Sequence, residues 1–389
     1  MVKDRKIPYA TQWISAGDVA AVSGALKSGW LTQGPGVREF EEKAAGYCGA
    51  KYAVAVSSGT AALHIAALAA GFKAGDEVIT SPITFAASAN CILYSGAKPV
   101  FADIDKRTYC IDPLKIKSAI TRKTRGIIPV HFGGHPCEMP KVQKLARENG
   151  LKVIEDAAHA IGATYGYRGR EFKVGSCAHS DMTVFSFHPV KHITSGEGGM
   201  VTTNDEGLYR KLLLLRSHGI TRDASLMEKK GEGPWYYEMV ELGYNYRVSD
   251  FQCALASSQL DRLDGFVRRR REIVEMYNSS FRDTKELVTP YEKPGSQSSY
   301  HLYVVQLRSI DRKKAFEALS ARGLGVNVHY IPVYTMPYYR KLGFKMGLCP
   351  AAEGYYKKAI TLPLYPKMSD EDVEYVIRAV KDTMDALKA

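Results

Sequence analysis

Short β-branched and apolar runs alternate with longer helix-like stretches over the first two thirds of this chain. Such runs occur at residues 52–56, 77–81, 99–104, 126–132, 152–156 and 183–187, and helical patterns lie between most of them. Strands joined through helices pair in parallel, and a parallel sheet needs helices on both of its faces. The alternation therefore predicts an α/β fold built on a mostly parallel sheet.

The last third of the chain has a different character, which begins near Asp261. A long charged helix pattern is followed by strand-like residues 300–307, a helix pattern at 313–323, strand-like residues 326–330 and a final helix pattern at 370–388. This mixture predicts a smaller α+β domain. Because ligands of parallel sheets bind at the carboxyl ends of strands, the turns after the predicted strands are the first candidates for function.

Composition is that of an ordinary soluble globular protein. Of the 389 residues, 45% are hydrophobic and 24% are charged, and no window approaches the ~18 apolar residues of a membrane span. Residues 1–13 lack an apolar signal-peptide core, so we expect a cytoplasmic protein. The seven cysteines are odd in number and show no C-x-x-C spacing, which favours buried, reduced thiols over disulfides.

The net charge of +12 arises from 53 basic and 41 acidic residues. Such a balance suits nucleic acid, an acidic surface or a phosphorylated small substrate. The basic residues are mostly dispersed, and their densest run, residues 268–271, lies in an amphipathic helix pattern where we expect a solvated face. No nucleic-acid-binding motif accompanies this run, so we expect no nucleic-acid partner.

One segment, HFGGHPC, brings potential metal ligands close together in the sequence. His131, His135 and Cys137 lie within seven residues, but a fourth ligand at a suitable spacing is missing. We therefore expect no metal site.

Asp156 ends the apolar run KVIED and is the first candidate for chemistry. A carboxylate in a mostly apolar setting is costly unless a cation pairs with it. A protonated pyridine nitrogen is one such cation, and the contact would keep the ring protonated. The alternative is that Asp156 caps a helix formed by AAHAIG.

Two further turns follow strands. Ser57, Ser58, Gly59 and Thr60 lie between a strand and a helix, where backbone amides and hydroxyls suit a phosphate, although simple helix capping is the alternative. The turn contains neither a Walker motif nor a G-x-G-x-x-G fingerprint. Phe85 follows the next strand and is either a platform for a cofactor ring or a core residue.

Lys191 follows the strand-like residues 183–187 and precedes a glycine-rich turn. A partly desolvated lysine can act as a Schiff-base nucleophile, and the glycines at 196, 198 and 199 let other backbone approach it closely. Ser186 is a candidate phosphate ligand. His188 and His192 are either general bases or hydrogen-bonded loop residues, and we assign them no role.

The order of these elements resembles one protein family. The motifs SSGTAAL, PITFAASAN, EDAAHAIGA, FSFHPVK, GEGGM, LRSHGI, GYNYRVSD and VHYIPVY are similar to those of the DegT/DnrJ/EryC1/StrS sugar aminotransferases, and the similarity covers nearly the whole chain. The resemblance implies fold type I, a seven-stranded, mostly parallel sheet and a smaller C-terminal α+β domain. It divides the chain into an N-terminal segment (1–30) that contributes to the substrate site and small domain, a large cofactor-binding domain (31–255) and a small domain (256–389).

The resemblance also implies pyridoxal phosphate as cofactor, with Lys191 as the catalytic residue that binds it covalently. It places Asp156 on the pyridine nitrogen, Phe85 on the ring and His159 beside it, where the family often has glutamine. The implied cofactor site comprises Ser58, Gly59, Thr60, Phe85, Asp156, His159, Ser186, Lys191 and Asn245. Asn245 would reach the cofactor of a second subunit, so the resemblance implies a homodimer with shared active sites.

The substrate contacts implied by the resemblance come from Tyr9, Trp30, Leu31, Thr32, Gln33, His329 and Tyr330. The motifs PVHFGGHPC, FSFHPVKHIT and VHYIPVY look most like those of the aminotransferases of pseudaminic acid biosynthesis. That similarity implies transfer of an amino group, from glutamate, to C4 of a UDP-linked keto-sugar, forming UDP-4-amino-4,6-dideoxy-N-acetyl-β-L-altrosamine. Arg247 could meet a donor carboxylate or a diphosphate, or form a structural ion pair.

Three alternatives remain open at this point. Family members that dehydrate sugars at C3 carry histidine in place of the lysine, so Lys191 favours amino transfer. Amination at C3, or of another nucleotide sugar, fits the same residues. A non-catalytic binding protein with a basic surface is the remaining alternative, but no separate nucleic-acid-binding module is visible.

Overall fold

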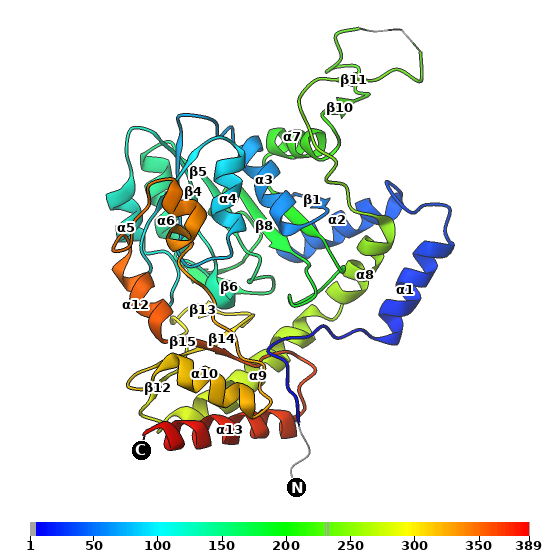
Figure 1. The fold of residues 1–389 in the computed structure, drawn as a ribbon. Coiled ribbons are helices and arrows are strands. Elements are labelled where there is room, and N and C mark those ends of the chain that lie inside the picture. The colour runs from blue at the N-terminus through cyan, green and yellow to red at the C-terminus, as the bar shows by residue number, and fades with distance from the viewer. Residues whose placement is uncertain (1–4, 230, 232, 389) are drawn as a thin grey trace.

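Seven strands form the central sheet of the protein (Figure 1). The computed structural model describes residues 5–229, 231 and 233–388. The strand order is β1 (Tyr52–Val56), β9 (Gly199–Thr203), β8 (Met182–Ser186), β5 (Lys152–Asp156), β4 (Thr124–Ile128), β2 (Glu77–Thr80) and β3 (Lys98–Phe101). Only β9 runs antiparallel to its neighbours in this sheet. The α/β prediction with a mostly parallel seven-stranded sheet is confirmed.

Alternate residues of the strands face opposite layers of helices, as the two-residue period of a strand requires. In β1, Val54 and Val56 pack in one apolar cluster with α3 (Gly59–Ala69) and α7 (Glu206–Arg216). Ala53 and Ala55 belong to a second cluster with α2 (Pro35–Cys48) and α8 (Asp250–Leu260). The sheet is therefore buried on both faces.

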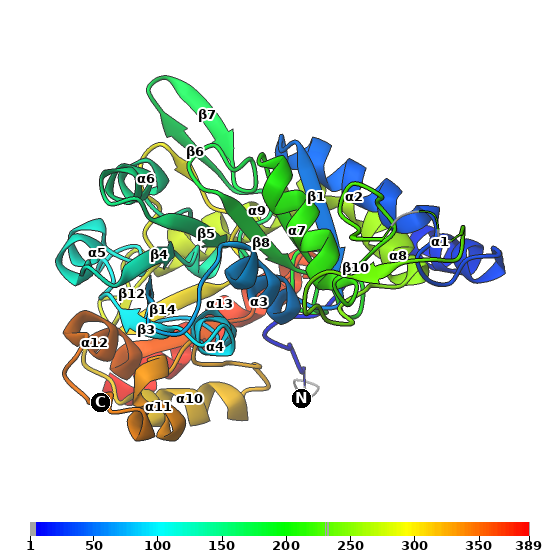
Figure 2. The same ribbon diagram turned by 90° about the horizontal axis from the view of Figure 1, so that it is seen from above.

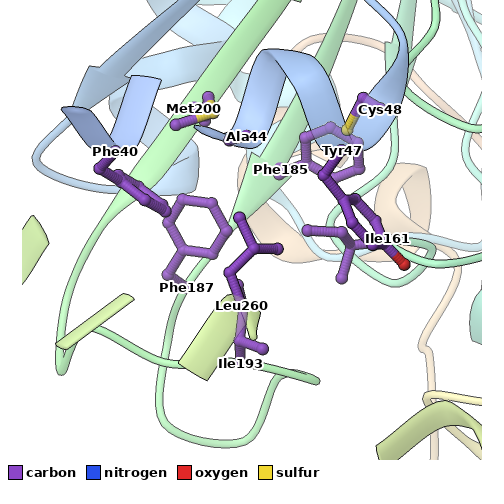
Figure 3. Close-up of a pocket in the computed structure, with 10 residues that line it drawn as sticks. All are labelled: Phe40, Ala44, Tyr47, Cys48, Ile161, Phe185, Phe187, Ile193, Met200 and Leu260. Carbon is purple, nitrogen blue, oxygen red and sulfur yellow. The ribbon is translucent and has the colours of Figure 1, made fainter. Parts of the chain in front are cut away.

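The core on the α2 side is made of apolar side chains from α2, α8 and the strands (Figure 3). Phe40 of α2 meets Phe187, just beyond β8, edge to face with 5.4 Å between ring centroids. Phe185 and Met200 are fully buried beside them. This packing fixes the start of the loop that leads from β8 to Lys191.

The predicted strand at 326–330 is wrong, and the small domain takes its third strand from elsewhere. The small sheet has the order β12 (Leu287–Val288), β14 (Tyr303–Leu307) and β15 (Ala359–Leu362), with antiparallel pairing. Residues 326–330 make only an isolated bridge between Asn327 and Thr361. Residues 327–330 line the cavity described below instead.

Long helices complete this part of the molecule. Helix α9 (Leu263–Phe281) runs from the large sheet to the small one, α13 (Asp370–Lys388) packs beside it, and α10 (Arg312–Ala321) packs on α13. The expectation of a solvated arginine face on α9 is wrong for Arg270, which is 1% exposed. Its guanidinium lies among three backbone carbonyl groups.

The remaining helices pack against strands or against other helices (Figures 1 and 2). They are α1 (Ala16–Lys27), α4 (Ala87–Tyr94), α5 (Pro113–Ala119), α6 (Met139–Glu148), α11 (Pro337–Lys341) and α12 (Pro350–Lys358), with short 3₁₀ turns at Phe132–Gly134 and Val333–Thr335. Helix α1 packs against α8. None of the helices described is both long and apolar enough to cross a membrane.

Two small sheets project from this frame. One has the order β13 (Ser296–Gln297), β6 (Thr164–Tyr167) and β7 (Arg170–Lys173). The other pairs β10 (Ile220–Thr221) with β11 (Glu238–Met239) in an arm that extends beyond α7 (Figure 1). The three-part division of the chain stays a prediction, and its boundary at 255/256 falls inside α8.

Candidate active site

A cavity of about 610 Å³ lies where strand ends of the large sheet meet the small domain. Ser58 follows β1, Phe85 follows β2, Asp156 ends β5, and Ser186 ends β8 shortly before Lys191. The carboxyl ends of these parallel strands share one edge of the sheet, which is why residues distant in sequence converge. The predicted residues that line the cavity are Tyr9, Ser58, Gly59, Thr60, Phe85, Asp156, His159, Ser186, Lys191, His329 and Tyr330.

Asp156 does not cap a helix, because residues 157–162 form turns rather than a helix. Its side chain is buried and accepts hydrogen bonds from the Ser88 hydroxyl at 2.5 Å and the Ala158 amide at 3.1 Å. Ser88 has a single proton, so its contact of 2.6 Å with Thr84 requires Thr84 to donate. These bonds orient a carboxylate that also lines the cavity.

The start of α3 lies against the end of β8. Ser58 caps the helix by accepting a hydrogen bond from the Ala61 amide at 3.1 Å, as the capping alternative proposed. The first amides of a helix have no partner within the helix and favour anions. A Cβ atom on Gly59 would lie 2.8 Å from Cβ of Ser186, so only glycine allows this approach. Capping and phosphate binding are compatible here, since the Ser58 hydroxyl keeps its proton to donate.

The amine of Lys191 lies near the Asp156 carboxylate without bonding to it. No hydrogen bond or ion pair to this amine occurs among the described residues. Burial lowers the pKa of Lys191 to about 8, and the nearby charge of Asp156 opposes that shift. A lowered pKa makes the neutral, nucleophilic amine accessible close to neutral pH.

His159 is a neutral imidazole. Burial, and then the charge of Lys191, lower the pKa of His159 well below its usual value. Its Nε2 lies 3.1 Å from the Tyr330 hydroxyl, and the two rings stack with 5.9 Å between centroids. Phe85 is 63% exposed, so the alternative of a core phenylalanine is wrong. Its ring stands edge-on to Tyr330 with 6.4 Å between centroids.

This donor set fits pyridoxal phosphate. Asp156 offers a carboxylate for a pyridinium nitrogen, Lys191 offers an amine for the aldehyde, and Phe85 offers an exposed ring face. The start of α3 and Ser186 offer amides and hydroxyls for the phosphate.

Five of the predicted residues do not line the cavity of their own chain: Trp30, Leu31, Thr32, Gln33 and Asn245. Trp30 is 57% exposed in the connection between α1 and α2, and Thr32 pairs with Ser249. Asn245 pairs with Ser217 beside the projecting arm. The roles predicted for these residues would require a second chain.

Several residues of the site were not predicted from the sequence. Ser88 and Thr84 orient Asp156, and Asn327 and Glu197 line the cavity. Ser88 lies in the same PITFAASAN motif as Phe85, one helical turn further on, so its hydroxyl could have been included. No local pattern indicates Asn327, because its place depends on how the small domain meets the sheet.

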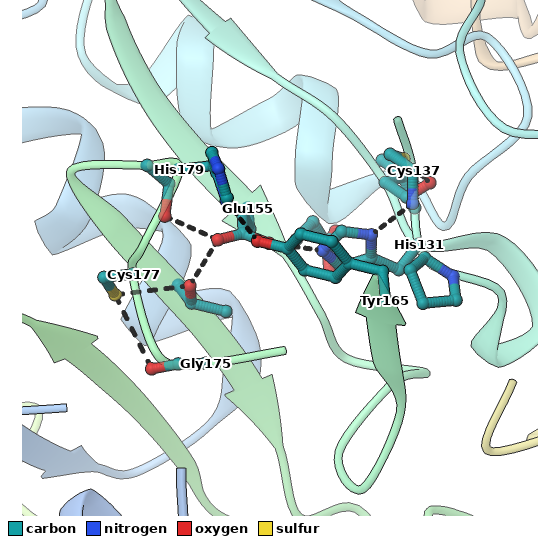
Figure 4. A network of polar contacts seen from close by, with 12 residues as sticks. His131, Cys137, Glu155, Tyr165, Gly175, Cys177 and His179 are labelled. Carbon is teal, nitrogen blue, oxygen red and sulfur yellow. Dashed lines mark hydrogen bonds and ion pairs between the residues drawn. The ribbon is translucent and has the colours of Figure 1, made fainter. Parts of the chain in front are cut away.

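His131, His135 and Cys137 do not share a ligand position. His131 forms a buried contact of 2.7 Å with Glu155, which also accepts from Thr183 at 2.9 Å (Figure 4). The ring nitrogens of His135 contact the Pro136 carbonyl and the Lys293 amide. No group of three or more potential ligands suited to a metal occurs within the described part of the chain.

The fold and this site define a pyridoxal-phosphate-dependent aminotransferase of fold type I. The chain belongs to the DegT/DnrJ/EryC1/StrS aminotransferase family, whose sequence profile matches residues 13–381. The resemblance seen in the sequence motifs is thereby confirmed, as are the sugar aminotransferase class and the cofactor.

Among the relatives that match nearly the whole chain are two with informative names. The spore coat polysaccharide biosynthesis protein SpsC of Bacillus subtilis is 44% identical over 98% of each chain. The UDP-4-amino-4,6-dideoxy-N-acetyl-β-L-altrosamine transaminase of Campylobacter jejuni is 40% identical over 97% of this chain and 96% of its own.

Solved structures agree with the fold. The aminotransferase PseC of Helicobacter pylori, involved in the biosynthesis of pseudaminic acid, superposes with a TM-score of 0.89 at 32% identity. The putative sugar aminotransferase Spr1654 of Streptococcus pneumoniae, solved in its pyridoxal phosphate form, has a TM-score of 0.91 at 31% identity. Each comparison covers 98% of this chain and 100% of the other.

Proposed function

We propose that this enzyme transfers an amino group, from glutamate, to C4 of a UDP-linked 4-keto-6-deoxy-N-acetylhexosamine. The product would be UDP-4-amino-4,6-dideoxy-N-acetyl-β-L-altrosamine, an intermediate of pseudaminic acid biosynthesis. The observation that carries the proposal is the 40% identity, over nearly the whole chain, to the Campylobacter transaminase named for that product. The cavity supports it with a lysine, a buried carboxylate and an open rim.

We assign the work of the site to these residues. When bound, pyridoxal phosphate supplies an electron sink that allows an amino group to leave one carbon and join another. Asp156 holds a proton on the ring nitrogen, and Ser58, Gly59, Thr60 and Ser186 bind the phosphate. Nζ of Lys191 anchors the cofactor and, when freed, moves the proton of the carbon that carries the amino group.

Tyr9, His329 and Tyr330 are assigned to the substrate on the small-domain side of the cavity. His329 Nδ1 lies 2.8 Å from the Thr361 hydroxyl, which fixes its ring, and burial lowers the pKa of His329 to about 4. A neutral His329 can therefore hydrogen-bond a sugar without adding charge.

We propose a homodimer in which a second chain completes each site. Trp30, Leu31, Thr32 and Gln33 would contact the sugar nucleotide, and Asn245 would reach the phosphate of the partner's cofactor. Support comes from the position of these residues outside their own cavity and from the exposure of Trp30.

A second candidate is amination of a different nucleotide keto-sugar for a surface polysaccharide. It is favoured by the 44% identity to the spore coat polysaccharide protein, which exceeds the identity to the altrosamine transaminase. Both candidates use the same cofactor and lysine, and they differ in the shape of the substrate.

The experiment is to incubate the enzyme with glutamate and a panel of UDP-4-keto and UDP-3-keto sugars, and to determine the configuration of each product by NMR. The proposal expects turnover of the L-arabino 4-keto sugar with the new amine at C4. Turnover of another sugar alone would establish the second candidate. Borohydride reduction followed by peptide mapping should place the cofactor on Lys191, and a label on another lysine would overturn that assignment.

A further inference from the structure

Three consecutive residues, Ser299–His301, contact both the loop that carries Lys191 and the loop that carries His159. We call these three residues the clamp segment. Nε2 of His192, the residue after Lys191, lies 2.9 Å from the Ser299 carbonyl oxygen. The Ser299 hydroxyl donates to the carbonyl oxygen of His159 at 3.3 Å. One residue of the clamp segment therefore bonds both catalytic loops.

The histidine side chains of the clamp segment and of the two loops are also in contact. The His301 ring lies 4.4 Å from the His159 ring and 5.6 Å from the His192 ring, between centroids. All three side chains are buried. His301 thus packs between His159, which is proposed to lie beside the cofactor, and His192, which follows Lys191 in the chain.

The clamp segment is itself held from two sides. A Cβ atom on Gly134, which has a φ of +100°, would lie 2.7 Å from the Tyr300 amide and 2.9 Å from the His301 amide. From the other side, Arg270 donates to the carbonyl oxygens of Tyr300 at 3.2 Å and His301 at 3.3 Å. Because the clamp segment is held in this way, it can keep the two loops that contact it in fixed positions.

His301 contacts its neighbours through its ring and not through a hydrogen bond of its Nδ1. Within the described structure, Nδ1 of His159, His192 and His301 is buried without a hydrogen-bond partner. An unsatisfied buried polar atom destabilises the folded state, and phenylalanine would fill similar space without one.

We propose that His301 is a positioning residue of the active site, whose ring packing fixes His159 and the loop of Lys191 relative to each other and fills space from which water would otherwise reach the lysine amine. This inference rests on the proposed role of Lys191. Among the described residues, Lys191 shares the cavity with seven charged or titratable groups, and two buried histidines interact with its charge from outside the cavity lining. The first group comprises Tyr9, Asp156, His159, His188, Glu197, His329 and Tyr330, and the second comprises His192 and His301, with Arg270 behind them.

The test measures the pKa of Lys191 in the full-length protein freed of cofactor. Competitive acetylation by acetic anhydride, followed at Lys191 by mass spectrometry across pH, reports this pKa, which should be about 8 in the wild type. His301→Ala should admit water, raise the pKa towards 10.5 and weaken pyridoxal phosphate binding by roughly tenfold or more. His301→Phe should keep the packing and a pKa close to that of the wild type.

His179→Ala is the matched control. His179 is also buried, but its ring packs on Tyr165, Tyr167 and Phe172, none of which lines the cavity. An unchanged Lys191 pKa in folded His301→Ala, an equal shift in His179→Ala, or an equal shift in His301→Phe would each overturn the proposal.

If His301→Ala does not fold, His301→Val and His301→Phe carry the test. Valine leaves part of the space of the ring unfilled and should raise the Lys191 pKa, whereas phenylalanine should preserve it. Equal values in these two variants would contradict the proposal. Because the label is read without substrate, a failure to aminate any keto-sugar would not affect this comparison.

Discussion

Lys191 is a half-buried residue whose amine has more imidazoles than carboxylates around it. Burial lowers its pKa, Asp156 partly offsets that shift, and the neighbouring histidines stay neutral because their own pKa values are lowered. The folded protein thus disfavours the charged form of Lys191 at the place where an uncharged nucleophile is needed.

This burial makes stability depend on pH in a defined direction. In the unfolded chain Lys191 binds its proton up to its ordinary pKa of 10.5, whereas in the folded protein it loses the proton near 8. Between these values the unfolded state binds more protons, so a rise in pH favours folding. The free energy of unfolding of the cofactor-free protein should therefore rise from about pH 8 to 10.5 relative to that of Lys191→Met. Urea titrations of both proteins check this, and parallel pH profiles would contradict it.

Ser88 should matter through Asp156 rather than through packing. Ser88→Ala removes a hydrogen bond to the carboxylate and leaves Thr84 without its partner. The interaction free energy that holds Asp156 in place should fall by about 1–2 kcal/mol. The dissociation constant of pyridoxal phosphate, measured by absorbance titration, should rise roughly tenfold. Ser118→Ala removes an exposed hydroxyl bond within α5 and is the control. Unchanged cofactor affinity in Ser88→Ala would show that Asp156 does not need this bond.

At the scale of elements, the site depends on how closely the start of α3 approaches the end of β8. Gly59 permits this contact, and Ser58 caps the helix. The strands bring one residue each to the shared edge, and no single element contains a complete site.

Gly59→Ala should weaken cofactor binding by displacing this helix start. Its Cβ would meet Ser186 at 2.8 Å, so backbone must shift where the phosphate is proposed to bind. Gly46→Ala in α2 is the matched control, since its Cβ would have no neighbour within 4 Å. That control should stabilise the protein by about 1 kcal/mol, because alanine favours helix over glycine. Equal cofactor affinity in the two variants, by absorbance titration, would exclude a role for this contact.

At the scale of the whole molecule, one chain does not bring every predicted site residue to the same cavity. Lys191 and Asp156 face one cavity, while Trp30, Thr32 and Asn245 lie elsewhere. A dimer that shares its sites would reconcile the family resemblance with this arrangement.

Mixed dimers test this arrangement. Lys191→Ala and Asn245→Ala proteins should each lose most activity, and a heterodimer isolated through two different tags should recover about half of the wild-type rate. Recovery follows because one of its two sites then combines an intact lysine with an intact partner asparagine. Absence of recovery in a verified heterodimer would place Asn245 in its own chain's site.

The sequence predicted much of the fold and of the candidate site. Strand β1 begins and ends where predicted, and Ser58, Phe85, Asp156 and Lys191 meet in one cavity. Prediction failed where burial depends on distant segments. Residues 326–330 have strand-like composition, but residues 327–330 line the cavity. Arg270 belongs to a polar run but is enclosed by carbonyl groups.

The sequence by itself determined the α/β class, the strand ends that carry polar residues, and the family. These follow from periodic patterns and motifs that act over a few residues. Only the tertiary structure decided that Asp156 is held by Ser88 rather than capping a helix, and that Ser299–His301 connect the loops of Lys191 and His159. Such contacts join residues up to 140 positions apart, and they arise from packing between elements, which local periodicity does not specify.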